Sequence, residues 1–155
     1  MTESIEARLQ ALGIELPAAA APAANYVPYV LSGNQLFISG QLPIIAGGEQ
    51  FAGKVGADVD TETAERAARA CALNILAQAK DALGDLERIE RCLRVGGFVH
   101  TTPDFTDHPE VINGASNLLA DVLGERGKHA RFAVGCASLP RNVPVEVDAT
   151  FAVRA

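Results

Sequence analysis

The sequence predicts a single α+β domain in which helices cover one face of one β-sheet. Its 155 residues are the length of one ordinary domain. Segments with the helical period of about 3.6 residues alternate along the chain with runs that have the strand period of two. Apolar residues make up 48% of the chain and aromatic residues only 5%, so we expect a core of small aliphatic side chains with close contact between helices and sheet.

A short helix and a linker are expected ahead of the main domain. Three apolar residues recur at helical spacing after a possible cap at Thr2 or Ser4, namely Ile5, Leu9 and Leu12. Residues 17–25 are rich in alanine and proline, and proline discourages a continued helix. We therefore divide the chain into residues 1–24, an N-terminal helix and linker, and residues 25–155, the main domain.

The first half of the main domain predicts a hairpin, a loop and a long helix. Residues 26–31 and 36–39 read as strands around a tight turn at 32–35. A glycine-rich segment follows and predicts a mobile loop or loose hairpin. The clearest helix covers residues 61–83, because small apolar residues form one stripe along it and Gly84 follows as a stop signal.

The second half predicts three strands and one more helix. Residues 92–99 form a short apolar strand, and residues 107–110 read as a capping box that opens a helix ending before Gly124. Residues 131–137 and 145–153 are the last strands, and apolar residues alternate with polar ones in the second of them. The predicted order is αββαβαββ. With helices on one face only, the other face stays partly apolar, which favours burial by copies of the same chain.

Charge and cysteine content exclude several classes of function. The net charge of −6 disfavours nucleic acid and anionic membranes as partners. Three well-separated cysteines without a CxxC pair indicate neither a disulfide framework nor a zinc site. No apolar run approaches the roughly 18 residues of a membrane span, and no targeting signal is visible, so we expect a cytoplasmic protein.

Three patterns resemble functional motifs, but each has a better structural interpretation. Residues 48–54 match the GxxxxGK part of a phosphate-binding loop, but Val55 replaces the hydroxyl residue that would bind magnesium. Four possible metal ligands have spacing that fits no known site, so we expect no metal; they are His100, Asp104, Asp107 and His108. Cys92 lies between two arginines, yet a buried strand cysteine is the better interpretation.

Arg131 is the most informative single residue. It lies in an otherwise apolar strand and keeps its charge, so it needs an anion. That anion is either a structural carboxylate or the carboxylate of a ligand, since the planar guanidinium matches both. Asp148 is the obvious internal partner, because the last two strands should run antiparallel and could place both residues on one face. Spacing alone favours this structural salt bridge.

Several short motifs occur in a fixed order along nearly the whole chain. They are Pro28-Tyr29, the run Ser-Gly-Gln-Leu-Pro at 39–43, Asn113, Ala130-Arg131, Leu139-Pro140 and the run Val-Glu-Val-Asp-Ala at 145–149. In this order and spacing the sequence resembles the reactive intermediate deaminase family, also called RidA or YjgF, from about residue 25 to residue 154.

The resemblance implies a chorismate-mutase-like fold, a homotrimer with clefts between subunits, and cofactor-free chemistry. By position, Arg131 would hold the substrate carboxylate, which reverses the preference for a salt bridge. The cleft would be lined by Tyr29, Ser39, Gly40 and Asn113. In the family a glutamate and backbone carbonyls near the arginine hold a water. Asp148 would stand in the place of that glutamate, and Ala133 where many members have cysteine.

The expected function is therefore hydrolytic deamination of small enamine or imine carboxylates such as 2-aminoacrylate. The products would be a 2-keto acid and ammonia, with Arg131 and Asp148 as catalytic residues. The alternative is a non-catalytic trimer that binds small carboxylates as a metabolite sensor or scavenger. Ribonuclease activity, a label that some relatives carry, is disfavoured by the acidic charge and by the lack of a basic aromatic groove.

Overall fold

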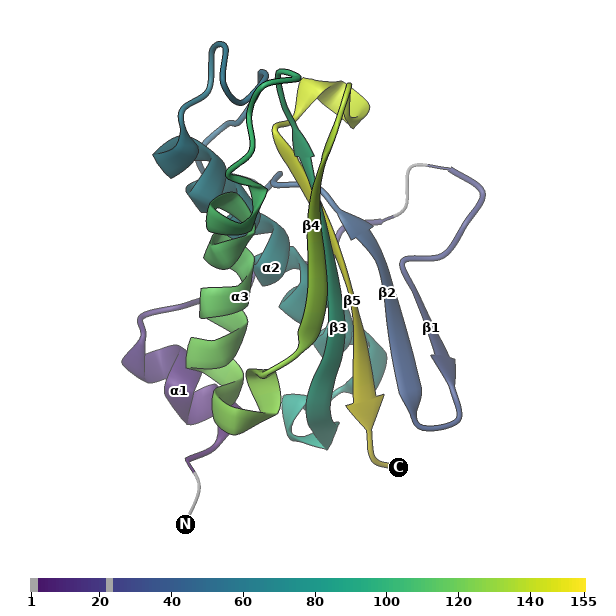
Figure 1. Ribbon diagram of the computed structural model, residues 1–155. Coiled ribbons are helices and arrows are strands. Elements are labelled where there is room, and N and C mark those ends of the chain that lie inside the picture. The colour runs from purple at the N-terminus through teal and green to yellow at the C-terminus, as the bar shows by residue number, and fades with distance from the viewer. Residues whose placement is uncertain (1–2, 22–23) are drawn as a thin grey trace.

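A computed structural model describes residues 3–21 and 24–155, in which three α-helices lie on one side of a five-stranded sheet (Figure 1). The α+β class is confirmed. The helices are α1 (Ile5–Ala11), α2 (Thr61–Leu83) and α3 (His108–Leu123). The strands are β1 (Tyr29–Ser32), β2 (Gln35–Gln41), β3 (Ile89–His100), β4 (Ala130–Cys136) and β5 (Val145–Val153). Thr2, one of the two possible caps, lies outside the described residues, as do positions 22–23 of the linker.

Helices α1 and α2 begin at the positions that the sequence predicted. Helix α2 has the predicted limits, since the side chain of Asp60 accepts a hydrogen bond from the Thr63 amide and Gly84 takes a positive φ of 77°. Helix α1 begins after Ser4, whose hydroxyl accepts from the Ala7 amide. The predicted capping box of α3 is wrong, because the side chain of Asp107 makes no cap hydrogen bond.

The sheet order is β1-β2-β5-β3-β4, and only the β3–β4 pair within this sheet is parallel. Strands β4 and β5 therefore run in opposite directions, as predicted, but β3 lies between them. The expected pair of Arg131 and Asp148 would require β4 and β5 to be neighbours in the sheet, and this expectation is wrong. Strand β3, helix α3 and β4 form one crossover unit, which places β4 directly beside β3.

The helices bury one face of the sheet and leave the other uncovered. Helices α2 and α3 contact each other closely, because Gly114 brings its backbone against the Glu65 carbonyl, where a side chain would not fit. In the central strand β5 every second residue from Val145 to Val153 is buried against the helices. The opposite face exposes large apolar side chains, namely Val30, Phe37, Phe98 and Val134. We call these four residues the open-face patch.

The glycine-rich segment between β2 and α2 contains no regular strand, but it is tied to the sheet. Val55 is fully buried and its amide donates to the His100 carbonyl at 2.8 Å. The amide of Gly53 donates to the Asn142 carbonyl at 2.8 Å. No helix in the described part of the chain is both long and apolar enough to cross a membrane.

Candidate functional site

Five of the predicted site residues fall into two groups, which are separated across the order of strands in the sheet. Arg131 and Ala133 lie on the edge strand β4, and Asn113 lies on α3, which packs against that strand. Ser39 and Gly40 lie on β2, with β5 and β3 between them and β4. One chain therefore does not bring the two groups together. We call them the β4 group and the β2 group.

Arg131 points towards the helices. It pairs in register with Val95 of β3, whose side chain is buried in the helix-covered core. Its Nη1 donates to the Ser116 hydroxyl at 3.1 Å and its Nη2 to the Pro109 carbonyl at 3.2 Å. Among the residues that the structure describes, Arg131 forms no ion pair. A half-buried guanidinium held only by neutral acceptors keeps a full charge available for an incoming anion.

Two other predicted residues complete the β4 group. Asn113 is exposed on α3, four residues after Pro109 and three before Ser116, so the three share one stripe of the helix. Ala133 follows Arg131 on the same face of β4 and packs against the core. The structure thus places an exposed amide beside the helix stripe that holds the arginine.

Asp148 does not meet Arg131, and the predicted salt bridge is wrong. Alternation along β5 directs Asp148 to the uncovered face, whereas Arg131 faces the helices. The Asp148 carboxylate instead accepts a hydrogen bond from the Gly96 amide at 3.0 Å. Glycine is needed there, since a Cβ at position 96 would overlap both this carboxylate and the ring of Phe132.

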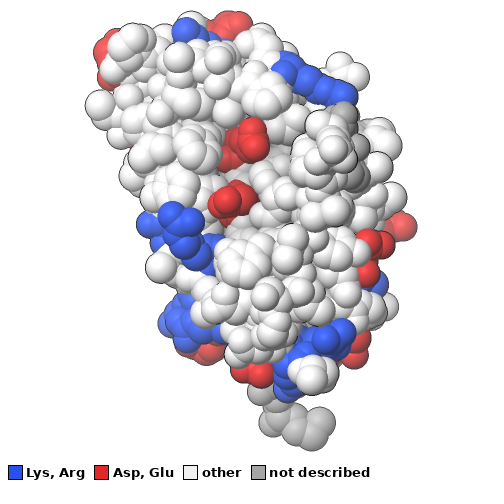
Figure 2. All heavy atoms as spheres, turned by 90° about the vertical axis from the view of Figure 1, so that its right-hand side faces the viewer, with Lys and Arg blue, Asp and Glu red and all other residues white. Residues whose placement is uncertain are grey.

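Glu146 is the functional candidate that sequence reasoning missed. It lies two residues before Asp148 on the same uncovered face, with its carboxylate directly against Gly40. Burial raises the pKa of Glu146, and the neighbouring Asp148 charge raises it further. Figure 2 shows acidic side chains in a hollow of this face, among mostly uncharged residues. The alternation that identified Asp148 also applied to Glu146 and could have found it.

The β2 group is shaped by an irregularity in its strand. The pairing of β2 with β5 shifts between Ile38 and Gln41, so Ser39 and Gly40 leave the regular ladder. The Ser39 hydroxyl donates to the Val27 carbonyl at 2.8 Å. A cavity of about 180 Å³ lies beside both residues, and Arg141 also lines it. This arginine is a second cation that the sequence reasoning did not single out.

Tyr29 is directed away from this cavity. Its hydroxyl donates to the Asp81 carboxylate of α2 at 2.8 Å, and this hydrogen bond raises the pKa of Tyr29. Its pairing partner in the hairpin is Ile38, a core residue, so Tyr29 faces the helices. The predicted role of Tyr29 in lining a cleft stays a prediction.

The patterns rejected from the sequence have ordinary structural roles. Burial raises the pKa of Cys92 to about 12, which makes its thiol unreactive. Lys54 donates its backbone amide to Asp58 at 2.7 Å in a turn, and α2 begins only at Thr61, so no helix follows the GxxxxGK match directly. Within residues 3–21 and 24–155 no cluster of three or more His, Cys, Asp or Glu side chains is arranged to hold a metal.

Comparisons with known proteins agree with this fold over nearly the whole chain. Residues 6–151 match the family described as "YjgF/chorismate mutase-like, putative endoribonuclease". The chain is 52% identical to Protein TCP17 of Trypanosoma cruzi over 146 residues, which cover 94% of this chain and 91% of that protein. It is also similar to the crystal structure of Atu1372 from Agrobacterium tumefaciens, a protein of unknown function. That likeness has 55% identity, a TM-score of 0.89, and coverage of 97% of this chain and 92% of the other.

A more distant likeness includes a bound ligand. The chain is 25% identical to TdcF of Escherichia coli, solved with bound serine, with a TM-score of 0.59. The likeness covers 90% of this chain and 94% of TdcF.

Proposed function

The chain belongs to the YjgF/chorismate mutase-like family, and on that premise we propose that it hydrolyses small enamine or imine carboxylates to a 2-keto acid and ammonia. The observation that carries the proposal is the unneutralised guanidinium of Arg131, held by Ser116 and the Pro109 carbonyl. A guanidinium is a bidentate partner for a carboxylate. The serine bound to TdcF, itself a small carboxylate, is consistent with this ligand class.

We also propose that a complete site forms between two copies in a homotrimer. One copy supplies the β4 group with Arg131 and Asn113, and its neighbour supplies the β2 group, Ser39 and Gly40, together with Glu146 of the adjacent strand β5. The open-face patch supports the assembly, since exposed Val and Phe side chains on one sheet face favour burial by another copy. Substrate would bind where the two groups meet.

The proposed reaction adds water to carbon 2 of the substrate. An enamine first takes a proton at carbon 3 and becomes a protonated imine, an iminium ion; an imine substrate takes this proton on nitrogen. The water oxygen bonds to carbon 2 as it loses a proton to a carboxylate, and the electron pair of the C=N bond moves to nitrogen, which takes a proton. The C–N bond of this carbinolamine then breaks, ammonia leaves with the electron pair, and the hydroxyl proton departs as the carbonyl forms.

Glu146 and Asp148 are the proposed proton carriers and water ligands. The raised pKa of Glu146 suits a group that accepts a proton from water and returns it to nitrogen. The Asp148 carboxyl group, which accepts from the Gly96 amide, lies beside it on the same face. We therefore keep Asp148 in the site and add Glu146, whose carboxylate lies nearer to Gly40.

Arg131→Ala tests the proposal. We expect the variant to lose at least about a hundredfold of the acceleration of keto acid release over the spontaneous reaction, because the half-buried carboxylate anchor is gone. The measurement couples a serine dehydratase, which generates 2-aminoacrylate, to pyruvate detection. Arg69→Ala, an exposed arginine on α2, is the matched control. Full acceleration by Arg131→Ala would exclude this assignment, and a loss confined to Arg141→Ala would move the anchor to the β2 cavity.

The second candidate is a trimer that binds small carboxylates without catalysis. The two groups are separate within one chain, and Arg131 could bind a carboxylate without help from Glu146 and Asp148. This separation is compatible with binding alone. Calorimetry with pyruvate separates the two functions. Binding that depends on Arg131, without any acceleration by the wild-type protein, would favour this candidate. Incubation with RNA at low salt tests the endoribonuclease description of the family, for which the net charge of −6 gives no support.

A further inference from the structure

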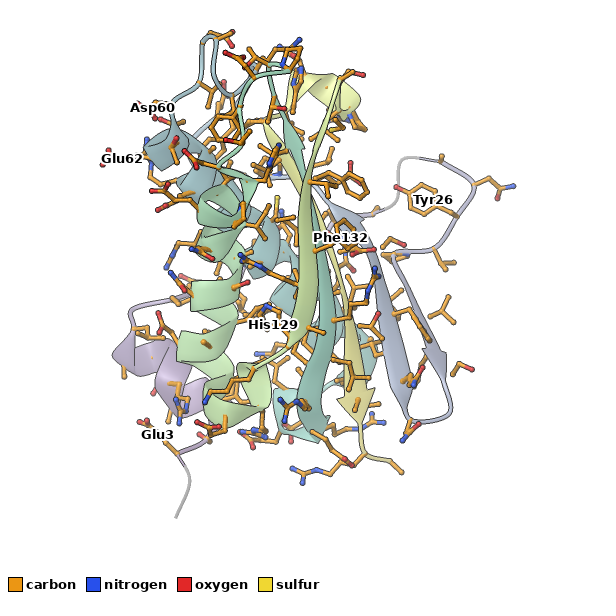
Figure 3. All side chains as sticks on the ribbon, viewed as in Figure 1. Glu3, Tyr26, Asp60, Glu62, His129 and Phe132 are labelled. Atoms are coloured by element: carbon orange, nitrogen blue, oxygen red, sulfur yellow. The ribbon has the colours of Figure 1, made fainter. Side chains whose placement is uncertain are left out.

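A chain of hydrogen bonds lies behind Arg131 and runs from strand β4 through helix α3. The Ser116 hydroxyl, which accepts from Arg131, is also 2.8 Å from Nε2 of His129. His129 precedes β4 directly, and its Nδ1 is 2.6 Å from the Gly127 carbonyl. Figure 3 shows His129 on the side of the sheet where α3 lies, and Phe132 further along β4.

With a neutral His129 ring, the chemistry of the three groups fixes the direction of every bond in this chain. A carbonyl oxygen only accepts, so Nδ1 of His129 must carry the hydrogen that Gly127 receives. In the neutral ring Nε2 is then an acceptor, and Ser116 must donate its hydroxyl hydrogen to it. Because the Ser116 hydrogen is used in this way, the oxygen of Ser116 accepts the hydrogen bond that Nη1 of Arg131 donates.

This polarity matters for how Arg131 is presented. With its rotation fixed by His129, the Ser116 hydroxyl always offers a lone pair to Nη1 and never a competing hydrogen. The Pro109 carbonyl holds Nη2 from the same stripe of α3, seven residues before Ser116. Two of the five N–H groups of the guanidinium are thus used, and the others stay free to bind an anion. A side chain held in one rotamer gives up less entropy when ligand binds.

We propose that His129 is a positioning residue, which acts through Ser116 to orient the Arg131 guanidinium for the substrate carboxylate. The inference rests on the proposed function, because it takes Arg131 as the carboxylate anchor. It adds two residues outside the predicted site set, and neither needs to touch substrate.

Two removals and two conservative replacements test the chain. Ser116→Ala and His129→Leu each interrupt it, and both should raise KM about tenfold while kcat falls less than about threefold, as loss of one hydrogen bond to a charged group implies. Ser116→Thr keeps a hydroxyl and His129→Gln keeps an acceptor near the place of Nε2, so both should recover most of the KM. Asn117→Ala, the next residue on α3, is the matched control.

The split between KM and kcat separates positioning from simple damage to the fold. A variant that only unfolds part of the protein lowers kcat and leaves KM unchanged, and thermal melting measures that fraction directly. Raised KM in the removals with recovery in the replacements supports the proposal. An unchanged KM in both removals, in a protein where Arg131→Ala abolishes turnover, overturns it and leaves the proposed function intact.

A spectroscopic measurement decides the matter even if the wild-type protein shows no turnover. Long-range ¹H–¹⁵N spectra of the imidazole distinguish the Nδ1–H form from its tautomer without any substrate. We expect the Nδ1–H form for His129, with the Nε2 signal of a hydrogen-bond acceptor that shifts in Ser116→Ala and in Arg131→Ala but not in Asn117→Ala. The opposite tautomer, or an Nε2 signal indifferent to Arg131→Ala, would show that no such chain orients the arginine.

Discussion

Two charged regions of this molecule are held in different ways. Arg131, on the helix-covered side of β4, is fixed by neutral acceptors on α3. Glu146 and Asp148 lie on the uncovered face of β5, where the backbone amide of Gly96 donates to Asp148. Within the described part of the chain no ion pair neutralises either region, and in the proposed trimer the two regions would come from different copies.

The largest expected effect comes from preventing copies from meeting. Val134→Asp places a charge in the open-face patch, where Val134 is 42% exposed in the single chain. Desolvating that charge in an interface is unfavourable, so the proposed trimer should fall apart and the rate enhancement should drop more than about a hundredfold. Light scattering measures the mass.

The control for this variant is Leu12→Asp at the end of α1. Leu12 is exposed to a similar degree, 46%, but lies away from the uncovered face. Its variant should keep the mass and the activity of the wild-type protein. Equal loss of mass in both variants, or none in Val134→Asp, would remove the open-face patch from the account.

A smaller effect is expected at the contact between Gly40 and Glu146. In Gly40→Ala the new Cβ overlaps the Glu146 carboxylate, which must move away from its position against residue 40. We expect about a tenfold lower kcat, since a displaced proton carrier is still present. Combining it with Glu146→Ala tests the cause by a double-mutant cycle. In the absence of Glu146, alanine at position 40 should cost almost nothing, and full additivity would contradict this explanation.

The smallest effect concerns stability and pH. The pKa of Glu146 is raised in the folded protein, so the folded state holds the proton more tightly than the unfolded one. Its contribution to stability is therefore present below the unfolded pKa and is lost as pH rises through the folded pKa. Glu146→Gln has no titrating group at this position, so it does not undergo this decrease in stability as pH rises. Denaturant unfolding at matched protein concentration should show the variant gaining on wild type from pH 4 towards neutrality, and a constant difference would refute the assignment.

The sequence predicted the limits of helices and strands better than it predicted which strands lie side by side in the sheet. Helix α2 could be delimited because Asp60 and Gly84 act locally, through a side-chain cap and a positive φ. The alternation in β5 likewise identified its buried face. Local signals also misled, since Asp107 resembles a cap but its side chain makes no such bond. Strand order depends on the path of α3 across the sheet, which no local pattern encodes.

The candidate site was predictable in part for the same reason. Arg131 stood out because a permanent charge in an apolar strand needs a partner, whatever the fold. The salt bridge with Asp148, which spacing alone favoured, does not form, because β3 lies between the two strands. Glu146 was overlooked although alternation along β5 places it on the same face as Asp148; only its contact with Gly40, which crosses from β5 to β2, requires the folded chain.

Mixing two variants that are impaired at different groups tests most directly whether the site is shared between copies. Arg131→Ala lacks the carboxylate anchor, and Glu146→Gln lacks the proton carrier. An interface is nevertheless intact where the Glu146→Gln copy supplies Arg131 and the Arg131→Ala copy supplies Glu146. Co-refolding at equal ratio should restore about a quarter of wild-type turnover, the share of such interfaces in randomly mixed oligomers. Activity that stays at the level of the separate variants, with mixed oligomers verified by mass spectrometry, would contradict a shared site.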